Sequence, residues 1–401
     1  MADLRNVRNE FPILSRYPEL VYLDSACTSL KPDQVIEAEM SYYREYGACG
    51  GRSSHRLGRK TSEAVDEART KVAQFVGGTP EGLVWTKNTT EALNLISNSF
   101  DFSKKRKVVT TVMEHHAVLL PYMKLREAGK IELEILHTDQ DRPGEIGKES
   151  WQKAIDRNTA LVVTNCGTNS TGITQDVQMI SKIAHDNGAL LCIDGAQGVP
   201  HHMIDMKRLG MDFLCFSGHK MLGPTGIGAM IASKDHLKDL NEYIVGGGTV
   251  KTVSREKADY MDDFSRFEAG IQDYAGIFGL AAACGYLKKI GMENVEAHEK
   301  MLAAAMISEL EYSGVEIYGP KTADKSALYS FNFKKAKAHD VALMLDQMNI
   351  AVRSGLFCAQ PAMEAMGAKD GAVRASGYIY TTHEDIKKLG DALRKSSVLY
   401  S

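Results

Sequence analysis

The sequence has little of what marks membrane, secreted or nucleic-acid-binding proteins. Its longest apolar run, 275–287, is interrupted by glycines and is shorter than the about 20 residues that cross a bilayer. Residues 1–5 do not begin an apolar signal-peptide core. Lys and Arg are scattered and the net charge is −3, so we expect no nucleic-acid partner. We therefore expect a cytoplasmic protein that does not associate with membranes.

Cysteine patterns that bind metals or build disulfide frameworks are also missing. The seven cysteines are an odd number and form no C-x-x-C pair, which argues against a zinc site and against a disulfide framework. Cys192 and Cys215 lie inside apolar runs and are typical of core residues. We expect no metal site, and we expect Cys27 and Cys49 to be inert rather than part of a metal site or a relay.

The order of apolar and polar runs predicts the fold class. Strand-like and helix-like runs alternate from 83 to 233, as is typical of an α/β domain with a mostly parallel sheet. Beyond Gly291 a long helix is followed by strands and a further helix, which is typical of a small α+β domain. We expect an N-terminal arm (1–20), a large domain (21–291) and a small C-terminal domain (292–401).

Two polar blocks follow short apolar runs and so fall at the carboxyl ends of buried strands, where open α/β sheets bind ligands. One block holds Asp194 and Gln197, and the other is 217–220, Ser-Gly-His-Lys. A lone lysine in a turn is usually a surface residue. With an acid at a neighbouring strand end, a lysine that forms a Schiff base in a dry site becomes the better interpretation of Lys220.

Two further turns follow strands and carry polar side chains. Thr89 and Thr90 open a helix after Trp85, where free N–H groups and hydroxyls suit a phosphate, although a plain helix cap is an equal interpretation. His115 and His116 follow the next strand. Histidines in such a turn are often surface groups.

Together these motifs resemble the fold-type I pyridoxal-phosphate (PLP) enzymes of the class V aminotransferase group, and within it the SUF-type cysteine desulfurases and selenocysteine lyases. The resemblance runs from residues 22–26, Tyr-Leu-Asp-Ser-Ala, to 374–376, Arg-Ala-Ser. It implies an α/β fold-type I PLP-dependent transferase. A large domain would have a mostly parallel mixed sheet, and a small α+β domain would carry the catalytic cysteine loop.

The resemblance implies the cofactor contacts. Lys220 would hold PLP, Asp194 would keep its ring nitrogen protonated, and His115 would stack on the ring and act in catalysis. The remaining implied contacts are Gln197 to the phenolic oxygen, Thr89, Thr90, Ser217 and His219 to the phosphate, and Asn169 to cofactor or substrate.

The resemblance also implies a substrate site for L-cysteine. Cys358 would attack the substrate sulfur, and Arg374 would clamp the carboxylate, a task that suits a guanidinium. Four further residues complete the implied site: Arg353, Asn169, Ala26 and His55. The products would be alanine and a Cys358 persulfide, whose sulfur would pass to an acceptor or iron–sulfur scaffold protein. Members of the family are homodimers, and we expect one here.

The sequence departs from the family pattern at four places, the first being Cys27, which stands where a second alanine is expected. Asn88 replaces a glycine of the phosphate segment, and Leu356-Phe357 replace one or two histidines before the cysteine. Ile271 stands where a threonine or serine donates to the partner subunit's phosphate. Because an isoleucine side chain cannot donate a hydrogen bond, we expect a weaker phosphate clamp.

Two other functions stay open. Another class V activity, such as an aminotransferase or a selenocysteine or cysteine-sulfinate lyase, would use the same cofactor residues, and an aminotransferase would not need Cys358. The second is a sulfur-assembly scaffold that has lost activity. Intact Lys220, Asp194, His115 and Arg374 argue against the scaffold, whereas Ile271 and Leu356-Phe357 leave it some room.

Overall fold

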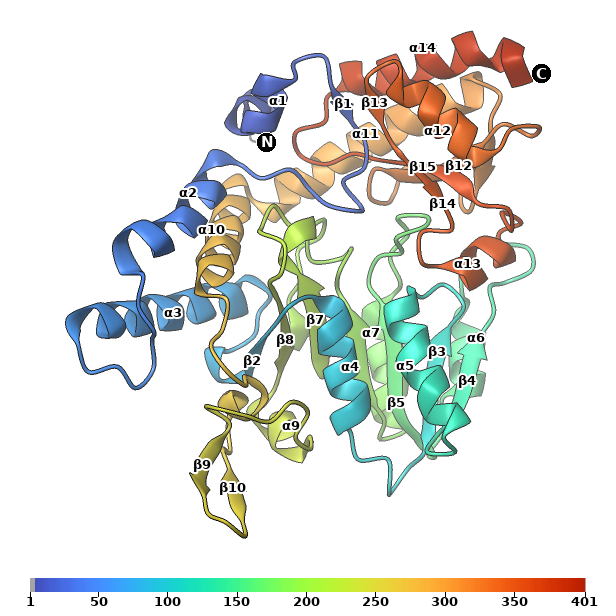
Figure 1. The fold of residues 1–401 in the computed structure, drawn as a ribbon. Coiled ribbons are helices and arrows are strands. Elements are labelled where there is room, and N and C mark those ends of the chain that lie inside the picture. Colours follow the sequence, from blue (N-terminus) through green and yellow to red (C-terminus); the bar gives the residue numbers. More distant parts are fainter. Residues whose placement is uncertain (1–3, 401) are drawn as a thin grey trace.

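The computed structural model describes residues 4–400 and is built on a central seven-stranded sheet (Figure 1). The strand order is β2-β8-β7-β6-β5-β3-β4. Neighbours from β4 across to β7 are parallel, whereas β8 runs antiparallel to both β7 and β2. The predicted mostly parallel mixed sheet is therefore confirmed. Its strands are β2 (Leu83–Thr86), β3 (Lys107–Thr111), β4 (Glu132–Leu136), β5 (Thr159–Asn165), β6 (Leu190–Asp194), β7 (Phe213–Ser217) and β8 (Gly228–Ala232).

Helices cover both faces of this sheet, which is why its central strands are apolar along their whole length. In β5, Leu161 and Val163 pack in a core with α4 and α5, whereas Val162 points into a second core with α3, α6, α7 and α10. The helices of this part are α3 (Arg56–Phe75), α4 (Thr89–Ser99), α5 (His116–Glu127), α6 (Lys148–Ala154), α7 (Val177–Asp186), α8 (Met206–Leu209), α9 (Lys234–Asp239) and α10 (Tyr274–Ile290). Short turns are η3 (Pro80–Gly82), η4 (Gly218–Lys220) and η5 (Phe264–Phe267).

The last part of the chain builds an antiparallel four-stranded sheet in the order β11-β12-β15-β14. It has its own apolar core, to which α11, α12 and α14 contribute. The sequence pattern predicts two strands after a helix over 340–348, and the structure has three short strands after α12. The elements are α11 (Met292–Tyr312), β11 (Glu316–Tyr318), β12 (Leu328–Asn332), α12 (Ala338–Asp346), β13 (Ile350–Ala351), β14 (Arg353–Gly355), α13 (Gln360–Ala365), β15 (Ala372–Ser376) and α14 (His383–Tyr400).

The N-terminal segment crosses to this smaller part. After η1 (Leu4–Glu10) and α1 (Pro12–Arg16), strand β1 (Val21–Tyr22) pairs in parallel with β13. Val21 and Leu23 are buried in the smaller core. The proposed domain boundaries stay predictions, and residues 1–3 and 401 lie outside the described residues. The pairing nevertheless fixes residues 21–24 against a strand that is more than 300 residues away in sequence.

The sequence pattern predicts helices over 32–46 and 61–76, and the structure differs from the prediction in three local features. Helix α3 begins at Arg56 rather than Thr61, because His55 caps it by accepting a hydrogen bond from Gly58 N (3.2 Å). The helix predicted from residue 32 to Tyr46 is α2 (Asp33–Ser41) continued by a π-helical turn, η2 (Tyr42–Tyr46). An unpredicted hairpin of β9 (Val250–Val253) and β10 (Ala258–Tyr260) projects from the body (Figure 1).

The described residues hold neither a bilayer-spanning helix nor a metal-binding cluster. Within 4–400 no helix is long and apolar enough to span a bilayer. The same part of the chain holds no group of three or more His, Cys, Asp or Glu side chains arranged to bind a metal ion.

Candidate active site

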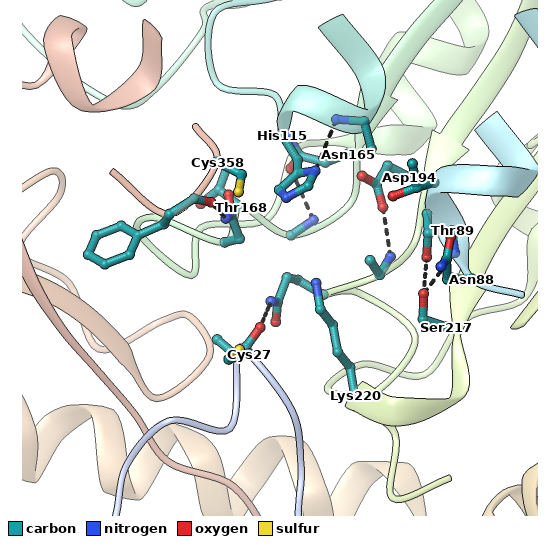
Figure 2. A pocket seen from close by; sticks show the side chains of 18 of the residues that line it. Cys27, Asn88, Thr89, His115, Asn165, Thr168, Asp194, Ser217, Lys220 and Cys358 are labelled. Atoms are coloured by element: carbon teal, nitrogen blue, oxygen red, sulfur yellow. Dashed lines mark hydrogen bonds between the residues drawn. The ribbon is translucent and has the colours of Figure 1, made fainter. Parts of the chain in front are cut away.

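A cavity of about 270 Å³ lies where the carboxyl ends of the parallel strands meet the smaller part of the chain (Figure 2). The sequence-predicted site residues line it with one exception, His55. Those that line it are Ala26, Thr89, Thr90, His115, Asn169, Asp194, Gln197, Ser217, His219, Lys220, Arg353, Cys358 and Arg374.

Lys220 and Asp194 come from neighbouring parallel strands. Asp194 ends β6, and Lys220 ends the turn η4 that follows β7. Burial lowers the pKa of Lys220, and the charge of Asp194 opposes this only in part. Burial likewise raises the pKa of Asp194, against a hydrogen bond from Ala196 N (2.9 Å) and the charge of Lys220. Lys220 Nζ donates to no side chain or carbonyl of the described residues, so its amine is free to react.

One end of the cavity is formed by the start of α4. Thr89 N donates to Ser217 Oγ (2.8 Å), and the Thr89 and Ser217 hydroxyls are 2.6 Å apart. Asn88 caps the helix by accepting from Glu91 N (3.0 Å), and its φ of −175° is extended backbone that any residue adopts. The helix N-terminus and these hydroxyls make a site for a phosphate. Asn88 in place of glycine therefore leaves that site intact.

His115 begins α5 at another wall. Its Nδ1 accepts a hydrogen bond from Ala117 N (3.0 Å), which leaves the ring proton on Nε2. Burial, followed by the charge of Lys220, lowers the pKa of His115 to about 4. The imidazole is therefore neutral at pH 7, and a neutral ring can stack on an aromatic cofactor.

Two buried amides present unused acceptors inside the cavity. Gln197 Nε2 donates to Ala26 O (2.7 Å), and Asn169 Nδ2 donates to Phe357 O (2.7 Å). Among the described residues neither Gln197 Oε1 nor Asn169 Oδ1 has a hydrogen-bond partner. Buried polar atoms are normally paired, so these two orphans indicate a site that a polar ligand completes.

These walls fit PLP. The phosphate site at α4, the acid Asp194, the reactive Lys220 and the neutral ring of His115 lie around one cavity, as a phosphorylated pyridine aldehyde requires. Gln197 keeps its second amide hydrogen for a ring oxygen.

The other end of the cavity carries two arginines from facing positions of β14 and β15. Arg353 lies opposite Arg374 in the strand register. Arg374 is only 3% exposed and donates to Asn169 O (2.8 Å), while its Nη2 lies 3.5 Å from Asp24 Oδ1. Its guanidinium also stacks on the Phe357 ring, 4.8 Å from the centroid. Asp24 is the acid beside these two guanidiniums. One negative charge does not neutralise two positive charges, so the pair can bind a substrate carboxylate.

Cys358 lies on an exposed loop at this end. Phe357 and Cys358 both have φ of 54°, a left-handed conformation that non-glycine residues adopt at a cost. The large sheet's own elements hold them there. Asn169 binds Phe357 O, and His116 N donates to Cys358 O (2.7 Å). His116 Nε2 also accepts from Gln360 N (3.4 Å), so α5 anchors the loop at Cys358 and again at Gln360.

His55 is exposed at the start of α3 and does not line the cavity, and its predicted role stays a prediction. No role at the site was predicted from the sequence for Asp24, His116 or Phe357. Asp24 ends an extended segment beside the predicted Ala26, and this was a usable signal. Phe357 and Arg374 belong to different parts of the chain, and no local sequence pattern predicts the contact between them.

Comparison with known proteins agrees with this geometry. The family model described as aminotransferase class-V matches residues 21–389. The chain is 37% identical to a cysteine desulfurase of Haloferax volcanii, over 100% of this chain and 98% of the relative. It is 36% identical to a cysteine desulfurase of Cronobacter sakazakii, over 96% of each.

Solved structures show the same likeness. A cysteine desulfurase from Thermococcus onnurineus NA1 superposes with a TM-score of 0.93 at 35% identity, over 98% of each chain. The cysteine desulfurase CsdA of Escherichia coli gives 0.91 at 28% identity, over 100% of each chain. The chain therefore belongs to the class-V aminotransferase family of PLP-dependent enzymes.

Proposed function

We propose that this protein is a cysteine desulfurase, which converts L-cysteine to L-alanine and keeps the sulfur as a persulfide on Cys358. The observation that carries the proposal is that the Cys358 thiol lines the same cavity as Lys220, Asp194 and Arg374. Relatives named cysteine desulfurase, similar along the whole chain, support it.

The cofactor end of the cavity would hold PLP. When bound, PLP supplies a conjugated ring that takes up the electron pair left when a proton is removed from the substrate. Asp194 would hold the ring nitrogen. The hydroxyls of Thr89, Thr90 and Ser217, with His219, would hold the phosphate at the α4 N-terminus.

Lys220 would move the α-proton of the substrate. Burial lowers its pKa, so a neutral amine that can accept a proton at Nζ forms more readily than on a surface lysine. The pKa of His115, lowered to about 4 by burial, keeps that ring uncharged beside the amine.

Arg374 and Arg353 would hold the carboxylate of L-cysteine at the end of the cavity where Cys358 also lies, within reach of the substrate sulfur. The Cys358 thiolate forms an S–S bond with that sulfur while the substrate Cβ–S bond breaks. The carbon product takes up protons and leaves as alanine. Because Cys358 is exposed, an acceptor protein can reach its persulfide, and we propose an acceptor of the iron–sulfur assembly type.

The decisive experiment incubates the PLP-loaded protein with L-cysteine and measures alanine, with and without reductant. Without reductant, mass spectrometry should find added sulfur on the Cys358 peptide. Cys358→Ala should still bind L-cysteine but hold no sulfur and form at least about 100-fold less alanine. Exchange of amino groups with a keto acid, undiminished in Cys358→Ala, would instead identify an aminotransferase.

We further propose that the protein is a homodimer. Ile271 is 73% exposed, and with the exposed Ile244 it lines a groove that shares Asn88 with the active-site cavity. A second subunit seated there would cover these side chains and close the phosphate end. Sedimentation at micromolar concentration tests this, and a fully active monomer would contradict it.

We also propose a cytoplasmic location, because persulfide chemistry needs a free thiol and the cytosol keeps thiols reduced. Fractionation of cells that express the protein tests this.

A further inference from the structure

We propose that Cys27 is a second sulfur-accepting thiol of the active site, which takes the sulfur from the Cys358 persulfide. This step rests on the proposed desulfurase function and follows it. Four of the seven cysteines are buried, and Cys49 is exposed outside the cavity. Cys27 is half-buried, and it lines the same cavity as Cys358 (Figure 2).

The wall that carries Cys27 is held firmly. Cys27 N donates to Asp24 O (3.0 Å), which closes a tight turn. On the residue before it, Ala26 N donates to Ser376 Oγ (2.9 Å), and Ala26 O accepts from Gln197 Nε2 (2.7 Å). The thiol is therefore presented to the cavity from a fixed backbone.

Cys27 faces the arginine pair that would hold the substrate carboxylate. Arg353 Nη2 donates to Cys27 Sγ at 3.0 Å, and Arg374 lies opposite Arg353 in the strand register. A thiolate is the stronger acceptor of such a charge-assisted hydrogen bond, and the thiolate is the form of cysteine that attacks sulfur. Cys27 therefore lies beside the arginines that would hold the substrate carboxylate, in the cavity that Cys358 also lines.

Both thiols also act on one lysine from within the cavity. Burial lowers the pKa of Lys220, and Cys27 and Cys358 are among the groups near enough to act electrostatically on this lysine. Gln197 and Asn169, whose amide nitrogens donate to Ala26 O and Phe357 O, line the cavity with their acceptors Oε1 and Oδ1 unpaired among the described residues. The space between the thiols is thus built for a polar, reacting ligand.

The chemistry balances without an oxidant or reductant. The Cys27 thiolate attacks the outer sulfur of the Cys358 persulfide, and a new S–S bond forms at Cys27. The S–S bond at Cys358 breaks, and Cys358 leaves as a thiolate. One sulfur atom has moved with its proton, and Cys358 can accept another from a second L-cysteine.

The test counts alanine and sulfur on the PLP-loaded protein without reductant. The wild type should release a burst of about two equivalents of alanine per protomer and carry added sulfur on both the Cys27 and Cys358 peptides. Cys27→Ser, which keeps the size of the side chain, should release about one equivalent and carry sulfur on Cys358 alone. Cys49→Ser is the matched control and should behave as the wild type.

Other outcomes would overturn the relay. A wild-type burst of one equivalent with unmodified Cys27 would refute the transfer from Cys358 to Cys27. Sulfur on Cys27 in Cys358→Ala would also refute it, because Cys27 would then be the first acceptor. A disulfide between Cys27 and Cys358 with free sulfide would show attack on the inner sulfur instead. Absence of alanine in the wild type would refute the desulfurase function and the relay together, whereas a normal Cys358 persulfide with unmodified Cys27 refutes the relay alone.

Discussion

The two ends of the active-site cavity are built in different ways. At the cofactor end, Asp194 and Ser217 stand on adjacent strands of one sheet and Thr89 opens the helix beside them. At the thiol end, Arg374 and Cys358 come from the smaller sheet and its loop, and Cys27 comes from the N-terminal segment. Topology alone places the first set, whereas contacts between distant parts of the chain place the second.

The difference extends to backbone conformation. The phosphate segment uses ordinary dihedral angles, with Asn88 extended. The cysteine loop holds Phe357 and Cys358 in the left-handed region and depends on His116 and Asn169 to keep them there. We infer that local sequence determines the geometry of the cofactor end. The geometry of the thiol end also depends on residues that are distant in sequence.

The largest expected effect comes from Lys220→Ala, because Lys220 serves both ends. Turnover should fall by at least about 1000-fold, measured as alanine released from L-cysteine. Borohydride reduction of the PLP-loaded wild type should attach the cofactor to Lys220. Lys31 is the control, since burial lowers its pKa to about 8 yet it does not line the cavity. Label on Lys31 would break the assignment.

Asp194→Ala tests the cofactor end by itself. Loss of the charged contact to the ring nitrogen should raise the barrier by about 3 kcal/mol, or about 100-fold in kcat. Sulfur already on Cys358 should still pass to an acceptor at the normal rate, which single-turnover mixing measures. A near-normal kcat would mean that another acid holds the ring.

Glu114→Gln tests the buried hydrogen-bond network next to the cofactor end. Glu114 is fully buried and accepts from Thr111 (2.7 Å), Thr164 (2.8 Å) and Asn165 (3.0 Å). Burial raises its pKa to about 7 from 4.5. An acid with a raised folded-state pKa stabilises the fold at low pH, and this contribution is lost as pH rises from about 4.5 to about 7.

Above pH 7 the wild type therefore keeps a buried carboxylate at a cost on the order of 3 kcal/mol, and the glutamine variant does not. The Tm of Glu114→Gln relative to wild type should be higher at pH 8.5 than at pH 5.5. Glu132→Gln, on the exposed side of β4, is the control, and its relative Tm should be the same at both pH values. If the Tm difference between Glu114→Gln and wild type were the same at pH 5.5 and pH 8.5, the charge of Glu114 would not be linked to folding.

Phe357→Leu tests the thiol end. It removes the ring from the Arg374 guanidinium, a stack worth about 1 kcal/mol. KM for L-cysteine should rise about fivefold with kcat nearly unchanged, because Phe357 orients the carboxylate clamp and does not touch the transferred sulfur. Leu356→Ala, which lacks that stack, should leave KM close to wild type. A loss confined to kcat would place Phe357 with the reacting groups instead.

The smallest effect is expected from Ile271→Thr, which adds a hydroxyl at the position that completes the phosphate site of a partner. PLP should dissociate about threefold more slowly, as followed by absorbance during dialysis. Ile244→Thr, also exposed, should not slow it. If both variants retain PLP equally, the cofactor end is complete within one subunit.

The sequence predicted the cofactor end well, because apolar strands followed by polar turns are local patterns and the sheet brings their ends together. Asp194, Ser217, Lys220 and His115 all line the cavity as expected. Less could be predicted at the thiol end. That Cys27 lies beside Arg353 and that α5 anchors the Cys358 loop depends on pairings between residues more than 200 positions apart, which no local window contains.

The pairing of β1 with β13 has a consequence for biosynthesis. Residues 21–22 cannot meet their partner strand until residues 350–351 have left the ribosome, and the Ala26 contact waits for Ser376. The large sheet, whose last strand ends at Ala232, needs none of these residues and can fold first during translation. A nascent chain therefore acquires the strands of its cofactor end well before its thiols share one cavity. The protein can therefore transfer sulfur only after nearly the whole polypeptide has been made.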